Sequence, residues 1–444
     1  MLPILAVLVT ACGGGDSGSP DTTDAAVPPA RENPCAEGFS DEARGYCVEK
    51  VPAAPCAPGT RPRIGETACV PVGWTAACPP GMLRDASGWG CIDVPAPAAA
   101  CAGASRMSLA SPTCVPIGDC NAAFPPAGAL LVDDDFDAGM LDATHFKTIT
   151  AAVQAAPSGA TIAIAAGTYV EGVDIDKPLS LIGRCAGQVT MKSPGGTASG
   201  ILTQKAAKIV VRGITLSGFA GGILVYGGGD ATIEDVVIQG SDRVGIEVDQ
   251  SKATVRRSKL VDPVPDAAKG RAWGISAGGP SEVLAEDVTI TGGTDGLFVA
   301  TEGTHVTVRS SIISGQRPPL SGSNRSRGAS AVDGALLTFE KSVLRDIVAD
   351  AALVADAGSV EATDTVIHGV RVDGNAARGH GISALLGGHL ELRSSAIVDA
   401  ESIGVFVKDA GSTVDLLDTV VRGPGKSGAV PNPSFQVTSE RSGI

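Results

Sequence analysis

The chain has 444 residues, a formal net charge of −14, 58 glycines and only 3% aromatic residues. A chain this acidic lacks the basic face that general nucleic-acid binding requires, so we exclude that class. No uninterrupted apolar run reaches eighteen residues, which argues against a membrane-spanning helix. Many glycines and few large side chains suit thin stacked strands and turns better than a globular core.

Residues 1–12 form an apolar leader that ends in Val9-Thr10-Ala11-Cys12. This phrase resembles the lipobox of bacterial lipoproteins, in which the cysteine becomes the lipidated first residue after signal cleavage. The alternative is a short hydrophobic leader followed by a chance cysteine. We predict lipid attachment at Cys12 and a flexible tether over residues 13–34. By resemblance, Gly13 after the cysteine implies sorting to the outer membrane of a diderm bacterium.

Residues 35–120 are rich in Cys, Pro and Gly, and their cysteines are regularly spaced. Units this short cannot close a hydrophobic core, and disulfides in an oxidising compartment usually stabilise them. Zinc is disfavoured because there is no CxxC and no neighbouring histidine. The spacing predicts the pairs Cys35/Cys47, Cys56/Cys69, Cys78/Cys91 and Cys101/Cys114, although sequence alone cannot prove connectivity. Cys120 and Cys185 remain, and their pairing would join this disulfide-rich stalk to the first coils of the next domain.

A short helix is predicted from residue 145 onward. Pro157-Ser158-Gly159 ends it, and the strand-like residues 160–165, a Gly167-Thr168-Tyr169 turn and the strand 179–183 follow. This order resembles the opening of right-handed parallel β-helices of the pectin-lyase-like superfamily, over about residues 130–425. The resemblance implies that the helix caps the open end of the solenoid. One face of the helix carries Ile149, Ala152, Val153 and Ala156.

From Ile214 to Val421, strand-like phrases recur at intervals of 22, 22, 30, 23, 31, 23, 30 and 24 residues. A period just above twenty is typical of a β-solenoid, whose coils must stack to bury a core. We therefore predict an all-β fold, a right-handed parallel β-helix over residues 121–430, with an irregular tail over residues 431–444. The last apolar residues of the phrases are Leu216, Ile238, Leu260, Ile290, Ile313, Leu344, Ile367, Ile397 and Val421.

Catalytic patterns known on this scaffold are incomplete here. It serves lyases, hydrolases, esterases and binding proteins, so fold does not fix function. The paired Asp and Arg phrases of pectin methylesterases are missing. Gly379-His380-Gly381 lacks the Asp phrases that polygalacturonases add, so we expect His380 to be a turn residue before a strand at 382–384. The carboxylates Asp133-Asp134-Asp135 and Asp137 could bind calcium but lie in an expected solvated connector. We predict no catalytic residue, metal or cofactor.

Alternation within one strand of each coil predicts which side chains point outward. General acid–base cleavage of a glycosidic bond normally needs two carboxyl groups, and this column supplies one. The predicted outward column is Leu224, Glu247, Ser276, Phe298, Ser330, Leu353, Ser383 and Phe406.

The three long intervals place extra residues at one point of the coil, after Leu260, Ile313 and Ile367. Insertions on one face of a solenoid often form its binding face. Basic and aromatic residues there predict a groove for an acidic polysaccharide or surface glycan. The alternative is that the phenylalanines pack under the loops and the arginines only aid solubility. The candidate binding residues are Lys269, Arg271, Trp273, Phe298, Arg317, Arg325, Arg327, Arg371, Arg378 and Phe406.

We therefore predict an envelope-anchored, non-catalytic protein that binds or displays at the cell surface. Its expected membrane contact is the lipid anchor alone. Two alternatives stay open, a polysaccharide-active lyase, hydrolase or esterase, and a purely structural spacer.

Overall fold

The computed structural model describes residues 35–41, 47–74, 77–78, 82–86, 88, 90–93, 101–196, 198–263, 270–318, 326–372 and 378–423. The chain divides into two compact units, residues 1–56 with 62–70 and residues 57–61 with 71–444. The predicted tether and Cys12 lie outside the described residues. No helix in the described part is long and apolar enough to cross a membrane.

The first unit is held by short strands and disulfides. Strands β1 (Phe39–Asp41) and β2 (Cys47–Glu49) pair antiparallel, and the Cys35–Cys47 and Cys56–Cys69 disulfides lie in this unit. The remaining short strands of the Cys-rich region are β3 (Thr60–Arg61), β4 (Val70–Pro71), β5 (Leu83–Arg84), β6 (Cys91–Asp93), β7 (Ser105–Ser108) and β8 (Ser111–Pro116).

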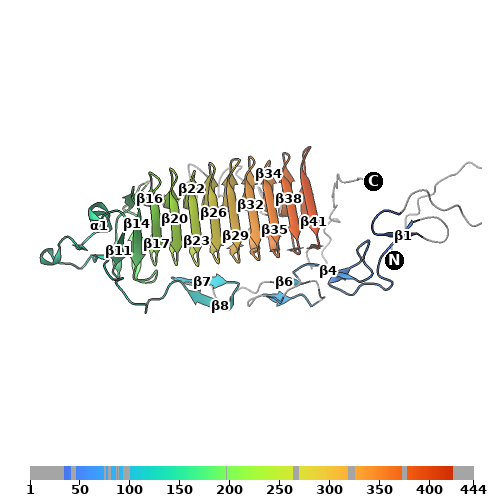
Figure 1. Ribbon diagram of the computed structural model, residues 1–444, viewed down its shortest axis with the longest axis horizontal. Coiled ribbons are helices and arrows are strands. Elements are labelled where there is room, and N and C mark those ends of the chain that lie inside the picture. The colour runs from blue at the N-terminus through green and yellow to red at the C-terminus, as the bar shows by residue number, and fades with distance from the viewer. Residues whose placement is uncertain are drawn as a thin grey trace, which may run out of the picture. The chain divides into compact units, whose positions relative to one another are not determined.

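Three long parallel sheets form a β-helix in the second unit, and Figure 1 shows its coils stacked in chain order from β11 to β41. Sheet 1 consists of β9 (Leu130–Val132), β10 (His145–Phe146), β11 (Ala160–Ile164), β14 (Leu179–Gly183), β17 (Lys208–Arg212), β20 (Asp230–Glu234), β23 (Lys252–Arg256), β26 (Glu282–Glu286), β29 (His305–Arg309), β32 (Leu336–Glu340), β35 (Ser359–Thr363), β38 (His389–Arg393) and β41 (Thr413–Leu417).

Each coil continues from sheet 1 into sheet 2 and then sheet 3. Sheet 2 consists of β12 (Gly167–Tyr169), β15 (Val189–Lys192), β18 (Thr215–Ser217), β21 (Val237–Gln239), β24 (Lys259–Val261), β27 (Thr289–Thr291), β30 (Ile312–Ser314), β33 (Val343–Val348), β36 (Val366–Arg371), β39 (Ala396–Val398) and β42 (Val420–Arg422). Sheet 3 consists of β13 (Val173–Ile175), β16 (Ser199–Thr203), β19 (Gly221–Val225), β22 (Val244–Asp249), β25 (Trp273–Gly278), β28 (Asp295–Ala300), β31 (Arg327–Val332), β34 (Ala351–Asp356), β37 (His380–Leu385) and β40 (Val405–Val407).

The predicted repeat is confirmed residue by residue in sheet 2. Leu216 pairs with Ile238, and the same row continues through each predicted apolar residue to Val421. These side chains belong to one hydrophobic core that extends along the β-helix. Because each coil buries its apolar face only against its neighbours, the core is continuous rather than divided among domains.

The turn from sheet 1 to sheet 2 repeats a backbone conformation that the sequence encodes. From β17 onward, one residue of this turn has a positive φ, and it is often an aspartate, such as Asp235, Asp287 or Asp364. Asp tolerates this left-handed conformation better than most side chains. The next residue is often a serine, and Ser311 Oγ accepts a hydrogen bond from the Val288 N–H one coil earlier at 3.0 Å. A row of buried hydroxyls therefore satisfies the backbone at this corner.

The predicted cap is present as helix α1 (Ile149–Ala155), and a 3₁₀ turn, η1 (Ala138–Met140), precedes it. The four residues of its predicted apolar face are all buried. Glu171 accepts hydrogen bonds from the N–H groups of Ile149 and Thr150, which satisfies free donors at the start of the helix. One detail of the prediction was wrong, because Gly167–Tyr169 forms strand β12 rather than a turn.

The hairpin β7–β8 lies against the outer face of sheet 2, which differs from the expected stalk. Its Arg106 is 3% exposed and donates to Asp287 Oδ1 at 2.6 Å. Thr289 Oγ1 donates to the Met107 carbonyl at 2.7 Å, and Ile117 packs against Val237. These residues lie on the outer surface of the coil. Strand alternation predicts that they point outward, but it does not predict that the hairpin covers them.

The structure contains the remaining predicted disulfides as well. Cys78–Cys91 and Cys101–Cys114 lie in the second unit, and Cys120–Cys185 joins the end of the Cys-rich region to an early coil. The regular cysteine spacing therefore predicted four of the five pairs, and the fifth was predicted from the two cysteines that remained.

Candidate functional site

The outer face of sheet 3 was the predicted binding face, and its register corrects one residue. The outward row runs through Leu224, Glu247, Ser276, Phe298, Ser330, Val354, Ser383 and Phe406. The predicted Leu353 instead points inward and is fully buried in the core. The neighbouring coils begin this phrase with a glycine, whereas Ala352 stands there in β34. Because this glycine is missing in β34, the register predicted from the sequence was one residue too early.

The glycine of this phrase also brings the first strand residue onto the outer face. A side chain on Gly381 would lie 2.5 Å from the Gly404 carbonyl oxygen, so β37 needs a glycine at this position. His380 Nδ1 lies 3.1 Å from Ser383 Oγ, although strict alternation would place these two residues on opposite sides. The first and fourth residues of such a strand therefore face the same way. That geometry places the predicted Trp273 and Arg327 on the candidate face and adds Asp295 and His380 to it.

The long insertions connect sheet 2 to sheet 3, as predicted. They follow β24, β30 and β36 and precede β25, β31 and β37. Lys269 and Arg325 fall outside the described residues. Arg317 and Arg378 are exposed, and Arg271 is half-buried.

Trp273 and Phe298 form an aromatic pair at one end of the face. Their ring centroids are 5.5 Å apart with an interplanar angle of 23°, and both side chains are half-buried. Trp273 Nε1 donates a hydrogen bond to Asp295 Oδ2 at 3.1 Å. Stacked rings with partly exposed faces are suited to contacts with the apolar faces of sugars.

Asp295 is a carboxylate that the sequence analysis missed, because it is not in the outward row. Its side chain is 1% exposed, and Oδ1 has no hydrogen-bond partner among the described residues. Burial raises the pKa of Asp295 to about 6, against the opposing influence of Arg327 and Arg271. The carboxyl group is therefore ionised at neutral pH but close to its titration range.

His380 and Phe406 form a second aromatic pair toward the other end of the face. Their centroids are 4.6 Å apart with an interplanar angle of 35°. His380 was expected in a turn, but it begins strand β37 and is 5% exposed. Burial, together with the nearby charge of Arg378, lowers the pKa of His380 to about 4. The imidazole is therefore neutral at pH 7.

The predicted basic row is partly neutralised. Arg327 pairs with Asp356 at 3.2 Å, and Arg371 pairs with Asp399. No ion pair involving Arg271, Arg317 or Arg378 is found within the described part of the chain. Among the described residues, Arg271, Arg317 and Arg378 are therefore the predicted arginines whose charge remains available to a ligand.

A second polar group on this face lies one coil before Trp273. Arg243 pairs with Glu247 at 2.7 Å. Burial and the neighbouring Glu247 carboxylate raise the pKa of Tyr226 to about 12. Tyr226 was not predicted, since it follows its strand and has no repeated counterpart in the sequence.

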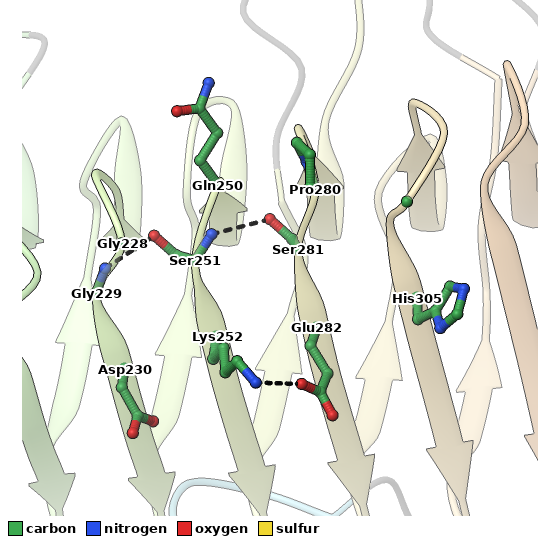
Figure 2. Close-up of a pocket in the computed structure, with 11 residues that line it drawn as sticks. Gly228, Gly229, Asp230, Gln250, Ser251, Lys252, Pro280, Ser281, Glu282 and His305 are labelled. Carbon is green, nitrogen blue, oxygen red and sulfur yellow. Dashed lines mark hydrogen bonds and ion pairs between the residues drawn. The ribbon is translucent and has the colours of Figure 1, made fainter.

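A cavity of about 380 Å³ lies elsewhere, where sheet 3 turns into sheet 1, and Figure 2 shows the side chains that line it. Gly228, Gly229 and Gly303 contribute no side chains to fill it. Lys252 points to Glu282, and these two form an ion pair at 2.6 Å. Because its main charged groups neutralise each other, this cavity offers little for a charged ligand to bind.

Two clusters within the described residues bring three possible metal-ligand atoms within 4.8 Å of one another. One comprises His389, Glu391 and Asp415 on sheet 1, and the other comprises Asp133, Asp134 and Asp135. Asp134 Oδ2 accepts a hydrogen bond from the Thr168 N–H at 3.2 Å, which ties the second cluster to strand β12. These carboxylates lie in the turn that directly follows β9, and Asp135 is exposed.

Residues 199–364 match the family model described as the right handed beta helix region. Together with the three parallel sheets, this match confirms the predicted right-handed parallel β-helix fold. No curated protein matches the sequence.

Several solved structures are similar at low identity. An alginate lyase from Paenibacillus sp. str. FPU-7 is 16% identical with a TM-score of 0.46, covering 62% of this chain and 95% of that one. The pectate lyase Pel9A is 14% identical with a TM-score of 0.44, covering 61% and 73%. PfbA, a surface adhesin of Streptococcus pneumoniae, is 10% identical with a TM-score of 0.31, covering 62% and 87%. These similarities carry no argument about activity.

Proposed function

We propose that this protein binds an acidic polysaccharide along the outer face of sheet 3 without cleaving it. The observation that carries the proposal is a unit that occurs twice on this face. In each unit, an arginine free of ion pairs within the described residues lies two positions before a ring at the start of a strand. That ring contacts a phenylalanine on the next strand. The units are Arg271, Trp273 and Phe298, and Arg378, His380 and Phe406.

The two units are evenly spaced along the β-helix. Trp273 and His380 are four strands apart, as are Phe298 and Phe406, which corresponds to about 19 Å at the usual strand spacing. The outward row between the phenylalanines holds only Ser330, Val354 and Ser383. An extended, repetitive ligand with a carboxylate near each end of this span would match the arrangement, because arginine recognises carboxylates and aromatic rings contact sugar faces.

Binding without cleavage is favoured by the state of the carboxylates. Asp295 is buried, Glu247 is held by Arg243, and Asp356 is held by Arg327. None of these three is presented as one of the paired acids that glycosidic cleavage requires.

Retention of the protein on a panel of acidic and neutral polysaccharides tests this proposal. We expect retention on an acidic polymer that weakens as salt is raised, with no unsaturated products or new reducing ends in the same wells. No retention on any glycan would contradict the proposal and leave the structural spacer as the better account.

A polysaccharide-active enzyme is the second candidate, and Asp295 favours it. A buried carboxyl group with a pKa of about 6 beside an aromatic ring has the properties of a general acid. Product formation that is lost in Asp295→Asn while binding persists would establish this candidate instead.

We also propose display at the bacterial outer membrane through a lipid on Cys12. The support is the lipobox-like phrase in the sequence. Incorporation of labelled palmitate in the wild type and its loss in Cys12→Ser is the expected result. Equal labelling of both would contradict lipid attachment at this cysteine.

A further inference from the structure

Asp295 occupies a position where a carboxylate is costly. It lies in the parallel ladder between Trp273 of β25 and Arg327 of β31. One oxygen accepts the indole N–H of Trp273, while the other is buried and has no partner among the described residues. A buried polar atom without a hydrogen bond destabilises the fold, so an apolar residue here would favour stability.

The hydrogen bond fixes a side chain that would otherwise have several rotamers. Trp273 is half-buried and begins its strand, so its ring has space on the solvent side. With its N–H bound to Asp295, the ring lies nearly parallel to that of Phe298, 5.5 Å away. The two half-exposed rings then form one aromatic surface that crosses two coils.

We infer that Asp295 is a positioning residue, which holds the indole of Trp273 in the stacked orientation that makes this surface. Its importance for ligand binding rests on the proposed function, whereas the positioning itself does not. The same contact makes Asp295 a determinant of how firmly a sugar ring can be held at this end of the face.

The charges around Asp295 make this positioning sensitive to pH. Arg271 lies before β25, and Arg327 of β31 lies on the other side and also binds Asp356 of β34. Because the pKa of Asp295 is about 6, the carboxyl group is ionised at pH 7.5 and mostly neutral at pH 5. A hydrogen bond to an ionised carboxylate is stronger than one to a neutral acid. The hold on Trp273 therefore weakens as pH falls through 6.

The near-ultraviolet circular dichroism of the full chain tests the inference without any ligand. The difference between the wild type and Trp273→Phe isolates the band of Trp273 from those of the other two tryptophans. We expect Asp295→Ala to lose this band and Asp295→Asn, whose amide oxygen still accepts the indole N–H, to keep it. The matched control Asp356→Asn removes a carboxylate of the same face that does not contact Trp273, and it should leave the band unchanged.

A pH titration and a binding assay complete the test. The wild-type band should change with a midpoint near pH 6, and Asp295→Asn should show no such change. Retention on the acidic polysaccharide should weaken about tenfold in Asp295→Ala, the equivalent of one hydrogen bond. A band that persists in Asp295→Ala, or one that disappears equally in both Asp295 variants, would overturn the inference. Loss of the band with unchanged retention would support the positioning role and count against the proposed function.

Discussion

The pKa values of Asp295 and His380 shift in opposite directions, and these shifts give a quantitative prediction for the free energy of unfolding. The pKa of Asp295 rises from 3.8 to about 6, which corresponds to about 3 kcal/mol at 1.36 kcal/mol per pKa unit. The folded state then binds a proton that the unfolded state releases between these values. The free energy of unfolding therefore increases by that amount as pH falls from above 6 to below 3.8.

His380 has the opposite effect over nearly the same range. Its pKa falls from 6.5 to about 4. Between these pH values the unfolded state therefore binds a proton that the folded state does not bind. Acidification from above pH 6.5 to below 4 therefore lowers the free energy of unfolding by about 3 kcal/mol. In the wild type the two contributions nearly cancel.

Single variants should reveal both contributions. Relative to the wild type, Asp295→Asn should lose about 2.5 kcal/mol of stability between pH 7.5 and pH 4, and His380→Gln should gain about 3 kcal/mol. Urea unfolding followed by far-ultraviolet circular dichroism, with the disulfides intact, measures these differences. Any cost of burying the new amide is the same at every pH. A stability difference that does not vary with pH for either variant would refute the argument.

Three further variants test the packing of the β-helix, each by urea unfolding at pH 7.5. Asp287→Ala leaves the buried arginine of the β7–β8 hairpin without its carboxylate and should cost about 3 kcal/mol, and a neutral result would mean that the hairpin does not dock. Replacing Cys120 and Cys185 by serine opens a loop of 65 residues and should lower the free energy of unfolding by about 4 kcal/mol. An unchanged urea midpoint in this variant would contradict the expectation. Leu353→Ala should cost about 3 kcal/mol because the side chain is in the core, whereas an outward residue would cost under about 0.5 kcal/mol.

The sequence predicted the repeat because strand alternation and stacking leave little choice. Residues such as Leu216 and Ile238 must point inward in every coil, and aspartates such as Asp235 mark the left-handed turn residue. The cysteine spacing predicted the short-range disulfides in a similar way, because a short closed hairpin brings its two ends together. These are local rules that repeat, so errors in one coil are corrected by the next.

The candidate site was less predictable because it depends on departures from those rules. Alternation places Asp295 and Phe298 on opposite sides, yet the tight glycine between them turns both to the same face. In β34, Ala352 replaces that glycine, which led to Leu353 being chosen over Val354. The ion pairs that neutralise Arg327 and Arg371 join different coils, so no local pattern could reveal them.

The most direct test of the central claim is the affinity of one retained acidic polysaccharide for matched variants. Trp273→Ala and Phe406→Ala each remove a ring from one of the two units on the sheet 3 face. Phe136→Ala removes a ring from a comparable pair with His145, at 5.5 Å, near the capping helix. We expect each of the first two variants to weaken binding about tenfold and the third to bind like the wild type. Equal affinity for all four proteins would contradict the claim that sheet 3 carries the binding face.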